Sequence, residues 1–313
     1  MKRFGFLNMG LIAMGLMVFS FTSCSDDPIP LPTVNFIATP NGYDVAITVE
    51  STNATTLAWT YGDGSTSAET TNHTHTYTKS GDYAIVVVAT NESGTATKTV
   101  NVTIAASMTE LLAGATASGK VWILDSGAGT SVQKIDKDLT LWTGLPAGAL
   151  DMFELGAEYD NEYTFKPSGD YGVAGKNGAV LTGILYSIIN ELDIIVPPNS
   201  GAAGLTGAAF TDATGKFVLH EGEDLTMSVT NEDYPNGTNE EGVTEVTFAK
   251  ANFLTFSEGL HFGVRDFNTT VLIKSLTPTK MDVTFFISSL NPEDYPESLG
   301  KASIAISTSM KLK

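Results

Sequence analysis

The stretch Thr55-Thr-Leu-Ala-Trp-Thr-Tyr-Gly-Asp-Gly64 decides the fold of the first part of the chain. Polar and apolar residues alternate up to Tyr61, which is the period of a half-buried β-strand. Trp59 and Tyr61 share one face of this strand because they are two residues apart, and we expect both to pack in a core. Gly62 and Gly64 then supply the positive φ angles of a hairpin turn.

The same period recurs on both sides of this stretch, and turn sequences separate the repeats. The alternating segments are Tyr43–Val49, Thr56–Tyr61, Tyr83–Ala89 and Thr97–Ile104. The turns are Thr39–Gly42, Gly62–Gly64, Lys79–Asp82 and Asn91–Gly94. Short strands at this spacing predict an immunoglobulin-like sandwich over residues 33–105.

Several motifs in this region resemble one domain family. Trp59-Thr-Tyr-Gly-Asp-Gly64 is similar to the Trp-x-Phe-Gly-Asp-Gly signature of PKD (polycystic kidney disease) domains. Three further segments fall where that family has its His-x-Tyr, Gly-x-Tyr and Val-x-Asn elements: His75–Tyr77, Ser80–Tyr83 and Ala89–Asn91. The resemblance implies a rigid spacer or a contact module.

Two histidines in this region raise the question of a metal site. His73 and His75 alternate onto one strand face with Tyr77. No Cys, Asp or third His lies at zinc-ligand spacing beside them. We therefore expect an ordinary sheet surface here.

The amino-terminal segment predicts export and lipid attachment. Lys2 and Arg3 precede an apolar run that ends in small residues before Cys24, the only cysteine of the chain. This order resembles a bacterial lipobox, which implies that residues 1–23 are a signal peptide and that Cys24 is lipidated. With no other cysteine, disulfides cannot stabilise the fold.

A retained membrane helix is the alternative for this segment. The apolar run is short for a membrane span, and Asp26 and Asp27 follow it in place of a basic cluster. The acidic pair after Cys24 is similar to the export signal of Bacteroidota surface lipoproteins. That resemblance implies a protein anchored in the outer membrane and facing the cell exterior.

The charge of the chain restricts its partners. The formal net charge is -18, and removal of Lys2 and Arg3 with the signal peptide makes it -20. Such an acidic chain repels phosphate backbones, which argues against nucleic acid as a partner. Neutral ligands such as glycans remain compatible with it.

Residues 24–32 form a linker between the lipid and the first domain. Pro28, Pro30 and Pro32 predict an extended conformation that holds the domain off the membrane. After residue 105, Ser107-Met-Thr-Glu110 has the form of a capping box. It predicts a short helix over Met108–Ala113, ended by Gly114, at the start of a second domain that covers residues 107–313.

The second domain is again rich in strand patterns. The expected strands are Val121–Leu124, Asn161–Phe165, Asp170–Ala174, Lys216–His220, Leu225–Val229, Glu245–Phe248, Val271–Leu276, Asp282–Ser288 and Ser303–Met310. The turn Lys166–Asp170 predicts a hairpin between the second and third of these strands. In Leu181–Ile195 the apolar residues recur at intervals of three and four residues, which favours a short helix over two buried strands.

The front half of this domain resembles a recurrent carboxyl-terminal domain of Bacteroidota surface lipoproteins in polysaccharide-utilisation systems. The segments that carry the resemblance are Glu110–Gly114, Lys120–Asp125, Trp142 near Pro146, and Tyr159–Phe165 before Gly169–Tyr171. The back half departs, because an aromatic-Glu-Ile element is missing near Thr270. The resemblance implies a jelly-roll-like β-sandwich that captures glycan without cleavage and works beside outer-membrane glycan transport proteins.

The acidic pattern Glu158-Tyr-Asp-Asn-Glu162 has a possible catalytic meaning. On one strand Glu158, Asp160 and Glu162 would point the same way, as the paired carboxylates of glycosidases do. The pattern resembles the Glu-x-Asp-x-Glu motif of laminarinase-like glycosidases. Asn161 is polar where that family has an apolar residue, and no tryptophan-rich platform flanks the motif. We therefore favour a solvated or calcium-holding loop over catalysis.

Glycan binding requires exposed aromatic faces with amide and carboxylate groups beside them. Trp142 lies in a stretch bounded by Gly and Pro, and we expect it on an exposed loop. Tyr159, Asn161 and Tyr234 are the expected companions. Trp122 lies within an apolar strand and is expected in the core.

The polar segment Asn231–Gly242 is the remaining candidate site. It is expected to be a surface loop, and its oxygen ligands make Asp233, with Asp160 and Glu162, a weak calcium candidate. No other metal or cofactor is expected.

The sequence thus predicts an all-β, lipid-anchored chain whose PKD domain is a spacer for a non-catalytic glycan-binding domain. The alternatives are a glycoside hydrolase that uses Glu158 and Glu162, and a structural or adhesive surface protein.

Overall fold

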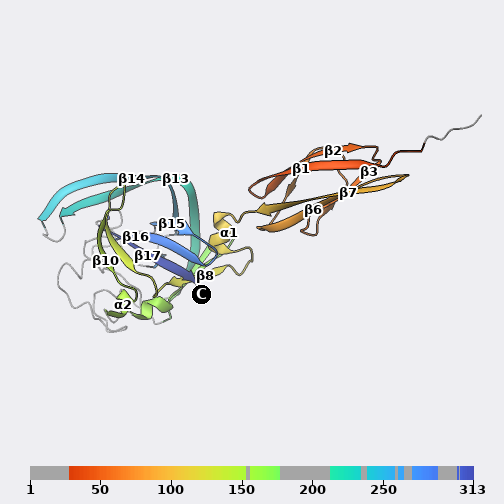
Figure 1. The fold of residues 1–313 in the computed structure, drawn as a ribbon. Helices are drawn as coiled ribbons and strands as arrows, with labels where there is room; N and C mark the ends of the chain where they lie inside the picture. The colour runs from red at the N-terminus through yellow and green to blue at the C-terminus, as the bar shows by residue number, and fades with distance from the viewer. Residues whose placement is uncertain are drawn as a thin grey trace, which may run out of the picture. The chain divides into compact units, whose positions relative to one another are not determined.

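The computed structural model describes residues 28–152, 156–176, 212–233, 238–257, 260–263, 270–287, 302 and 304–313. These residues are almost all β and form two compact units (Figure 1). The second unit contains Pro40–Asp44, Thr76–Asp82 and Thr103–Lys313, and the rest of the described chain forms the first. The signal segment with Cys24 and the expected helix Leu181–Ile195 lie outside the described residues. Within the described parts, no helix is both long and apolar enough to cross a bilayer.

Two antiparallel sheets account for the region that resembles a PKD domain. One has the order β1-β2-β5, with β1 Thr33–Asn41, β2 Asp44–Thr52 and β5 His73–Thr76. The other has the order β4-β3-β6-β7, with β3 Thr56–Thr60, β4 Thr66–Ser67, β6 Gly81–Asn91 and β7 Gly94–Ile104. Phe36 of the first sheet meets Trp59 of the second edge to face, with ring centroids 5.1 Å apart. The expected immunoglobulin-like sandwich is confirmed.

The motif that predicted this sandwich lies at its centre. Trp59 and Tyr61 are 1% and 2% exposed, which confirms that both pack in the core. Gly62 has a φ of +81°, and a Cβ atom there would lie 3.0 Å from the backbone nitrogen of Ala84. Glycine is therefore required both for the turn and for the close approach of β6.

The prolines before β1 do not stand away from the domain. Pro28–Leu31 is hydrogen-bonded through its carbonyl groups to the turn between β6 and β7. The expectation that this part of the linker is a spacer therefore differs from the structure.

The predicted capping box is present at the start of the larger domain. Helix α1 spans Met108–Ala113, and the Ser107 side chain accepts a hydrogen bond from the backbone N–H of Glu110 at 3.1 Å. Gly114 follows with a φ of 76° and ends the helix. Leu112 and Ala113 are buried, so this short helix contributes its apolar face to the core of the larger domain.

Eight antiparallel strands of the larger domain close into a ring. They are β8 Lys120–Leu124, β11 Glu162–Phe165, β12 Asp170–Ala174, β13 Ala213–Asp233, β14 Thr238–Phe256, β15 Thr270–Leu276, β16 Lys280–Ile287 and β17 Ile304–Leu312. Strands β11 to β17 pair in chain order, and β8 pairs with both β11 and β17. This sequential order differs from the Greek-key crossings of a jelly roll, while the all-β, sandwich-like class is confirmed.

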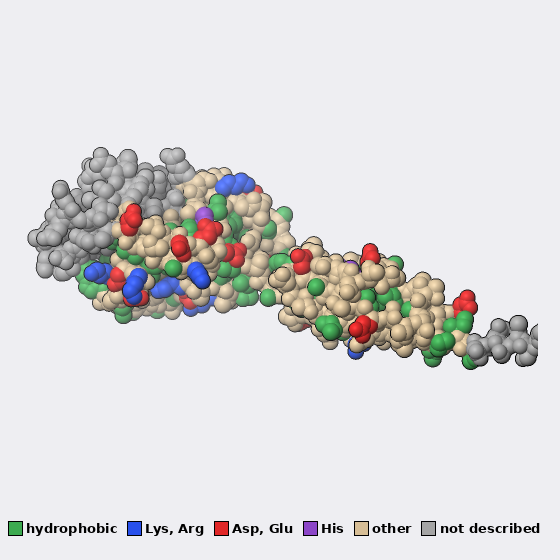
Figure 2. Space-filling model, turned by 90° about the horizontal axis from the view of Figure 1, so that it is seen from above, with side chains coloured by type: hydrophobic (Ala, Val, Ile, Leu, Met, Phe, Trp, Pro, Cys, Tyr) green, Lys and Arg blue, Asp and Glu red, His purple; other side chains and the backbone are tan. Residues whose placement is uncertain are grey.

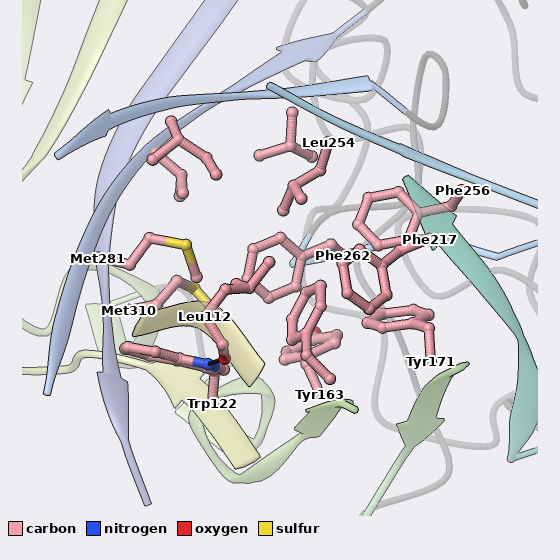
Figure 3. Close-up of a cluster of buried hydrophobic side chains, with 14 of the residues drawn as sticks. Leu112, Trp122, Tyr163, Tyr171, Phe217, Leu254, Phe256, Phe262, Met281 and Met310 are labelled. Atoms are coloured by element: carbon pink, nitrogen blue, oxygen red, sulfur yellow. Dashed lines mark hydrogen bonds between the residues drawn. The ribbon is translucent and has the colours of Figure 1, made fainter. Parts of the chain in front are cut away.

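The interior of the ring is filled with apolar side chains (Figure 3). Trp122 is fully buried, as expected, and its indole N–H donates to the carbonyl of Leu112 in α1 at 2.8 Å. The hairpin of β11 and β12, which the turn Lys166–Asp170 predicted, contributes Tyr163, Phe165 and Tyr171. Burial of such aromatic side chains is the main stabilising term for a fold without disulfides.

A second apolar cluster lies on the outer face of the same sheet. The register of β13 and β14 shifts on both sides of Glu223, and Gly222 has a φ of 66°. Before this bulge Phe217 belongs to the ring core, whereas after it Leu225 and Met227 belong to the outer cluster with Leu272 of β15. The far half of the hairpin thus packs over the sheet as a second layer, and Figure 1 shows both strands as long curved ribbons.

This hairpin corrects two sequence predictions. Lys216–His220 and Leu225–Val229 are parts of the one strand β13, and Glu245–Phe248 belongs to β14. The expected polar loop Asn231–Gly242 is largely the end of this hairpin, since β13 runs to Asp233 and β14 starts at Thr238. Long-range pairing in the sheet overrides the local polar composition.

Four elements between β8 and β11 were not predicted. They are β9 Thr130–Lys134, β10 Leu141–Leu145, helix α2 Ala149–Met152 and the 3₁₀ helix η1 Gly156–Asp160. Strand β9 pairs with the first half of β17, and β10 adds to β9. The two strands extend the ring into a ten-stranded sheet that ends at β10.

Candidate functional site

The strongest candidate surface is strand β10 at the end of the ten-stranded sheet. Among the described residues, β9 is its only strand partner. Every β10 residue except Leu145 is exposed, and the exposed fractions of Leu141 and Trp142 are 61% and 43%. An apolar pair on an exposed edge strand marks a surface suited to binding.

Trp142 is the extra residue of a β-bulge in this strand. Leu141 lies opposite Gln133 and Thr143 lies opposite Val132, so residues two apart in β10 pair with adjacent residues of β9. A bulge changes the direction of a side chain relative to the regular pleat, and bulges are common beside binding sites. The exposure expected for Trp142 is found, but on a bulged strand and not on a loop.

The connection from β9 to β10 is held by hydrogen bonds within it. The Asp136 carboxylate accepts from the backbone N–H groups of Asp138 and Thr140, at 3.0 and 3.1 Å. A hydrogen bond from the Thr140 side chain is the main reason that the pKa of Asp136 is lowered. The buried amide of Gln133 donates to the carbonyl of Leu139 at 2.8 Å. These bonds fix the position at which β10 begins, and so favour a preformed surface around Trp142.

The acidic pattern does not form a catalytic strand. Glu158 and Asp160 lie in η1, and Glu162 is the first residue of β11. The laminarinase-like arrangement, which requires the carboxylates on one strand face, is therefore wrong. The solvated loop that we favoured is also wrong, because Glu158 is buried in η1 and Glu162 belongs to β11.

Glu158 and Asn161 have a structural role inside the domain. Glu158 is 3% exposed and Asn161 is fully buried. The Asn161 amide donates to the Glu158 carboxylate at 2.8 Å, and its oxygen accepts from the backbone N–H of Lys176 at 3.1 Å. A buried carboxylate requires such donors, and this pair joins η1 to the end of the β11–β12 hairpin.

Glu162 is held between two lysines. Lys313 donates a hydrogen bond to one carboxylate oxygen, and the Lys176 ammonium group lies 3.2 Å from the other. The hydrogen bond from Lys313 lowers the pKa of Glu162, and Lys176 lowers it further. A glycosidase general acid requires a raised pKa, so Glu162 is unsuited to that role.

The expected companions of Trp142 lie in different surroundings. Tyr159 is half-buried against the ring core, and its hydroxyl oxygen accepts from the backbone N–H of Leu150 at 3.3 Å. Burial raises the pKa of Tyr159. Asn161 is buried as described above, and Tyr234 lies outside the described residues. Trp142 is thus the exposed aromatic residue of this set in the described structure.

The described residues offer little to a metal ion. They contain no group of three or more His, Cys, Asp or Glu side chains placed to hold one. The calcium candidates Asp160 and Glu162 therefore gain no support, and the side chain of Asp233 is not described. Figure 2 shows acidic and basic side chains distributed over the described surface of the larger unit.

The two histidines of the first domain pack against its core motif. The His75 ring stacks on Tyr61 with centroids 3.8 Å apart, and its Nε2 atom lies 2.9 Å from the Asp63 carboxylate. The His73 Nε2 atom shares a hydrogen bond of 2.8 Å with the Tyr61 hydroxyl group. Partial burial alone would raise the pKa of Asp63, but hydrogen bonds from Ser65 and His75 outweigh it and lower that pKa.

Sequence reasoning missed Leu141 as a surface residue beside Trp142. The segment that contains it has no regular alternation and is bounded by polar residues, so no strand was predicted there. Four exposed residues precede Leu145 in β10, and only the pairing with β9 shows the bulge among them.

Comparison with known proteins identifies the first domain. Residues 37–106 match the family model of the PKD domain, and this part of the chain is a PKD domain. A search of curated proteins finds no match to the chain.

Solved structures give three likenesses. The PKD1 domain of Vibrio anguillarum Epp is 25% identical, with 25% of this chain and 98% of that chain covered and a TM-score of 0.24. The PKD1 domain of the Vibrio cholerae metalloprotease PrtV is 26% identical, with 24% of this chain and 98% of that chain covered and a TM-score of 0.23. A carbohydrate-binding module of the β-sandwich superfamily is 10% identical, with 91% of this chain and 92% of that chain covered and a TM-score of 0.25.

Proposed function

We propose that this chain is a surface lipoprotein that binds glycan through strand β10, with Trp142 as the main contact. Cys24 is its point of attachment to the outer membrane, and the PKD domain is a spacer between the membrane and the glycan-binding domain. The observation that carries the proposal is the exposure of Trp142 and Leu141 on a bulged edge strand.

The chemistry of this surface suits a neutral sugar. The flat indole face of Trp142 is apolar and matches the CH face of a pyranose ring. Thr140 and Thr143 are exposed beside it and provide hydroxyl groups for hydrogen bonds to sugar hydroxyls. The backbone groups on the outer edge of β10 add donors and acceptors, since no described strand pairs with that edge.

The carboxylates favour binding without cleavage. A glycosidase requires an acid and a second carboxylate that both reach the substrate. Glu158 is buried and bonded to Asn161, and Glu162 is charged between two lysines. We therefore propose a non-catalytic protein whose partners are a polysaccharide and the outer-membrane proteins that transport it.

The test of glycan binding uses the soluble chain from Asp26 and a panel of polysaccharides. Affinity gels measure retarded migration, and a reducing-sugar assay measures cleavage. Trp142→Ala should abolish the retardation that the parent shows, whereas Trp142→Phe should keep part of it. Val218→Ser is the matched control, because Val218 is a 53% exposed apolar residue of the same domain on β13.

Each outcome separates the candidate functions. Retardation of Trp142→Ala equal to that of the parent would show that the site is elsewhere. Release of reducing ends would support the hydrolase. A parent chain that no polysaccharide retards would favour the structural or adhesive role.

Lipid attachment has its own test. Cells grown with radiolabelled palmitate should label the protein, and Cys24→Ser should remove the label. A parent protein that stays unlabelled, or that is found in the cytosol, would contradict the anchor.

A further inference from the structure

The chain enters the PKD domain through a hydrogen-bonded clamp. The Asn91 amide nitrogen donates to the carbonyl of Pro30 at 2.8 Å and to that of Asn53 at 2.7 Å. The Ser93 hydroxyl donates to the carbonyl of Ile29 at 2.5 Å. The segment before β1 is therefore fixed to the β6–β7 turn and to the end of β2.

The Asn91 side chain is itself fixed by the turn. Its oxygen accepts from the backbone N–H groups of Ser93 and Gly94, at 2.9 and 3.1 Å. With both amide hydrogens and the oxygen engaged, Asn91 has one orientation in which it can hold Pro30. The clamp is thus part of the turn and not an incidental surface contact.

The clamp shortens the connection to the lipid. Only the segment Cys24–Asp27 lies between the proposed attachment point and Pro28, and even fully extended it spans at most about 14 Å. A freely extended segment to Pro32 would roughly double that reach. The clamped end of the domain must therefore stay close to the bilayer surface.

Two apolar side chains point to solvent at this end. Ile29 is 48% exposed and Leu31 is 61% exposed, while Pro32 between Leu31 and β1 is buried. Leucine and isoleucine side chains gain free energy when they enter the interfacial region of a bilayer, and a nearby lipid anchor removes most of the entropic cost of that contact. The short tether identifies the bilayer as the surface that meets them.

We propose that Ile29 and Leu31 insert into the bilayer interface and that the Asn91–Gly94 turn faces the membrane. This end of the PKD domain then contacts the bilayer. The proposal rests on the attachment through Cys24. The opposite end of β6, at Gly81, is then up to about 34 Å further from the surface than Asn91, since the strand has 11 residues. The clamp thereby fixes the direction in which the spacer extends.

The experiment uses the full mature chain from Cys24, coupled through its single thiol to a maleimide lipid in phosphatidylcholine vesicles. Some vesicles carry brominated acyl chains, which quench tryptophan fluorescence at short range. The probes are Leu31→Trp and, as a matched control, Ile37→Trp, each with Trp142→Phe. Ile37 is 66% exposed, lies in β1, and is six residues further along the chain from the lipid than Leu31.

Quenching at position 31 should exceed that at position 37 by at least about twofold, because bromines lie only within the membrane. Equal quenching at both positions would mean that the domain lies flat on the bilayer, which overturns the proposal. Absence of quenching at position 31 would overturn it as well. Trp59 and Trp122 are 1% and 0% exposed and give the same background in both variants.

A third probe tests the clamp itself. A tryptophan introduced in the turn by Glu92→Trp should be quenched when the clamp is intact. The quenching should be lost when Asn91→Ala and Ser93→Ala are added and release the segment. Unchanged quenching would show that the clamp does not set the orientation. Coupling is chemical, so these results are independent of lipidation in cells and of glycan binding, and their failure is distinct from the failure of either.

Discussion

Asn161 was a candidate for glycan binding, and the structure gives it a role that a mutation can isolate. Asn161→Ala removes the amide that donates to the buried Glu158 carboxylate at 2.8 Å and accepts from the Lys176 backbone at 3.1 Å. A hydrogen bond to a charged group contributes about 1.5–3 kcal/mol, so we expect the free energy of unfolding to fall by about 2–3 kcal/mol.

Urea denaturation of the full chain measures this loss. For a domain of this size, with a slope near 2–3 kcal/mol per M urea, the midpoint of the larger domain should fall by about 1 M. Val218→Ser is the control, because Val218 is a 53% exposed residue of the same domain, and it should shift the midpoint by less than about 0.2 M.

Glycan retardation provides the second measurement. If Asn161 is structural, the polysaccharide should retard folded Asn161→Ala as strongly as the parent. The gels are run without urea, at a temperature at which both proteins are folded. An unchanged midpoint together with lost retardation would refute this reasoning and return Asn161 to the binding surface.

Three further predictions follow from individual contacts. Tyr163→Phe should lower the free energy of unfolding by about 1–3 kcal/mol in the same titration, because the fully buried hydroxyl donates to the Gly263 carbonyl at 3.1 Å. Gly62→Ala should lower the melting temperature of the PKD domain through a cost of about 1–3 kcal/mol, because its φ is +81° and β6 lies against it. Stability should fall as the pH drops below about 4.5, the ordinary pKa of glutamate, because the Lys313 hydrogen bond lowers the pKa of Glu162 in the folded state. This contribution is present above the ordinary pKa and is lost as the pH falls through the lowered one, so urea midpoints of Glu162→Gln should depend less on pH over that range than those of the parent.

Local patterns predicted the elements whose signals are local. The capping box placed α1 at its observed bounds, and the turn Lys166–Asp170 predicted the hairpin of β11 and β12. Trp59 and Tyr61 were assigned to the core from their spacing alone. In each case the residues that determine the structure lie within a few positions of one another.

Sequence patterns did not predict the elements whose conformation depends on pairing with another strand. Glu221–Asp224 is polar and contains a glycine, which is typical of a turn, yet these residues continue β13 through a bulge because β14 pairs along it. The same holds for β10, whose only described partner is β9 and whose residues show no alternation. Bulges and edge strands depend on register, and register is set across the sheet.

The acidic pattern and Trp142 show why residue type alone cannot identify a site. Glu158 and Asn161 were attractive because carboxylates and amides bind sugars, but burial makes their hydrogen bonds part of the fold's own stability. Trp142 is the reverse case, since complete burial of a large apolar side chain contributes about 1.5–3 kcal/mol, and 43% exposure gives up part of that stabilisation. The apolar area that stays exposed there can be covered by a ligand, and this is the physical reason for proposing glycan binding at β10.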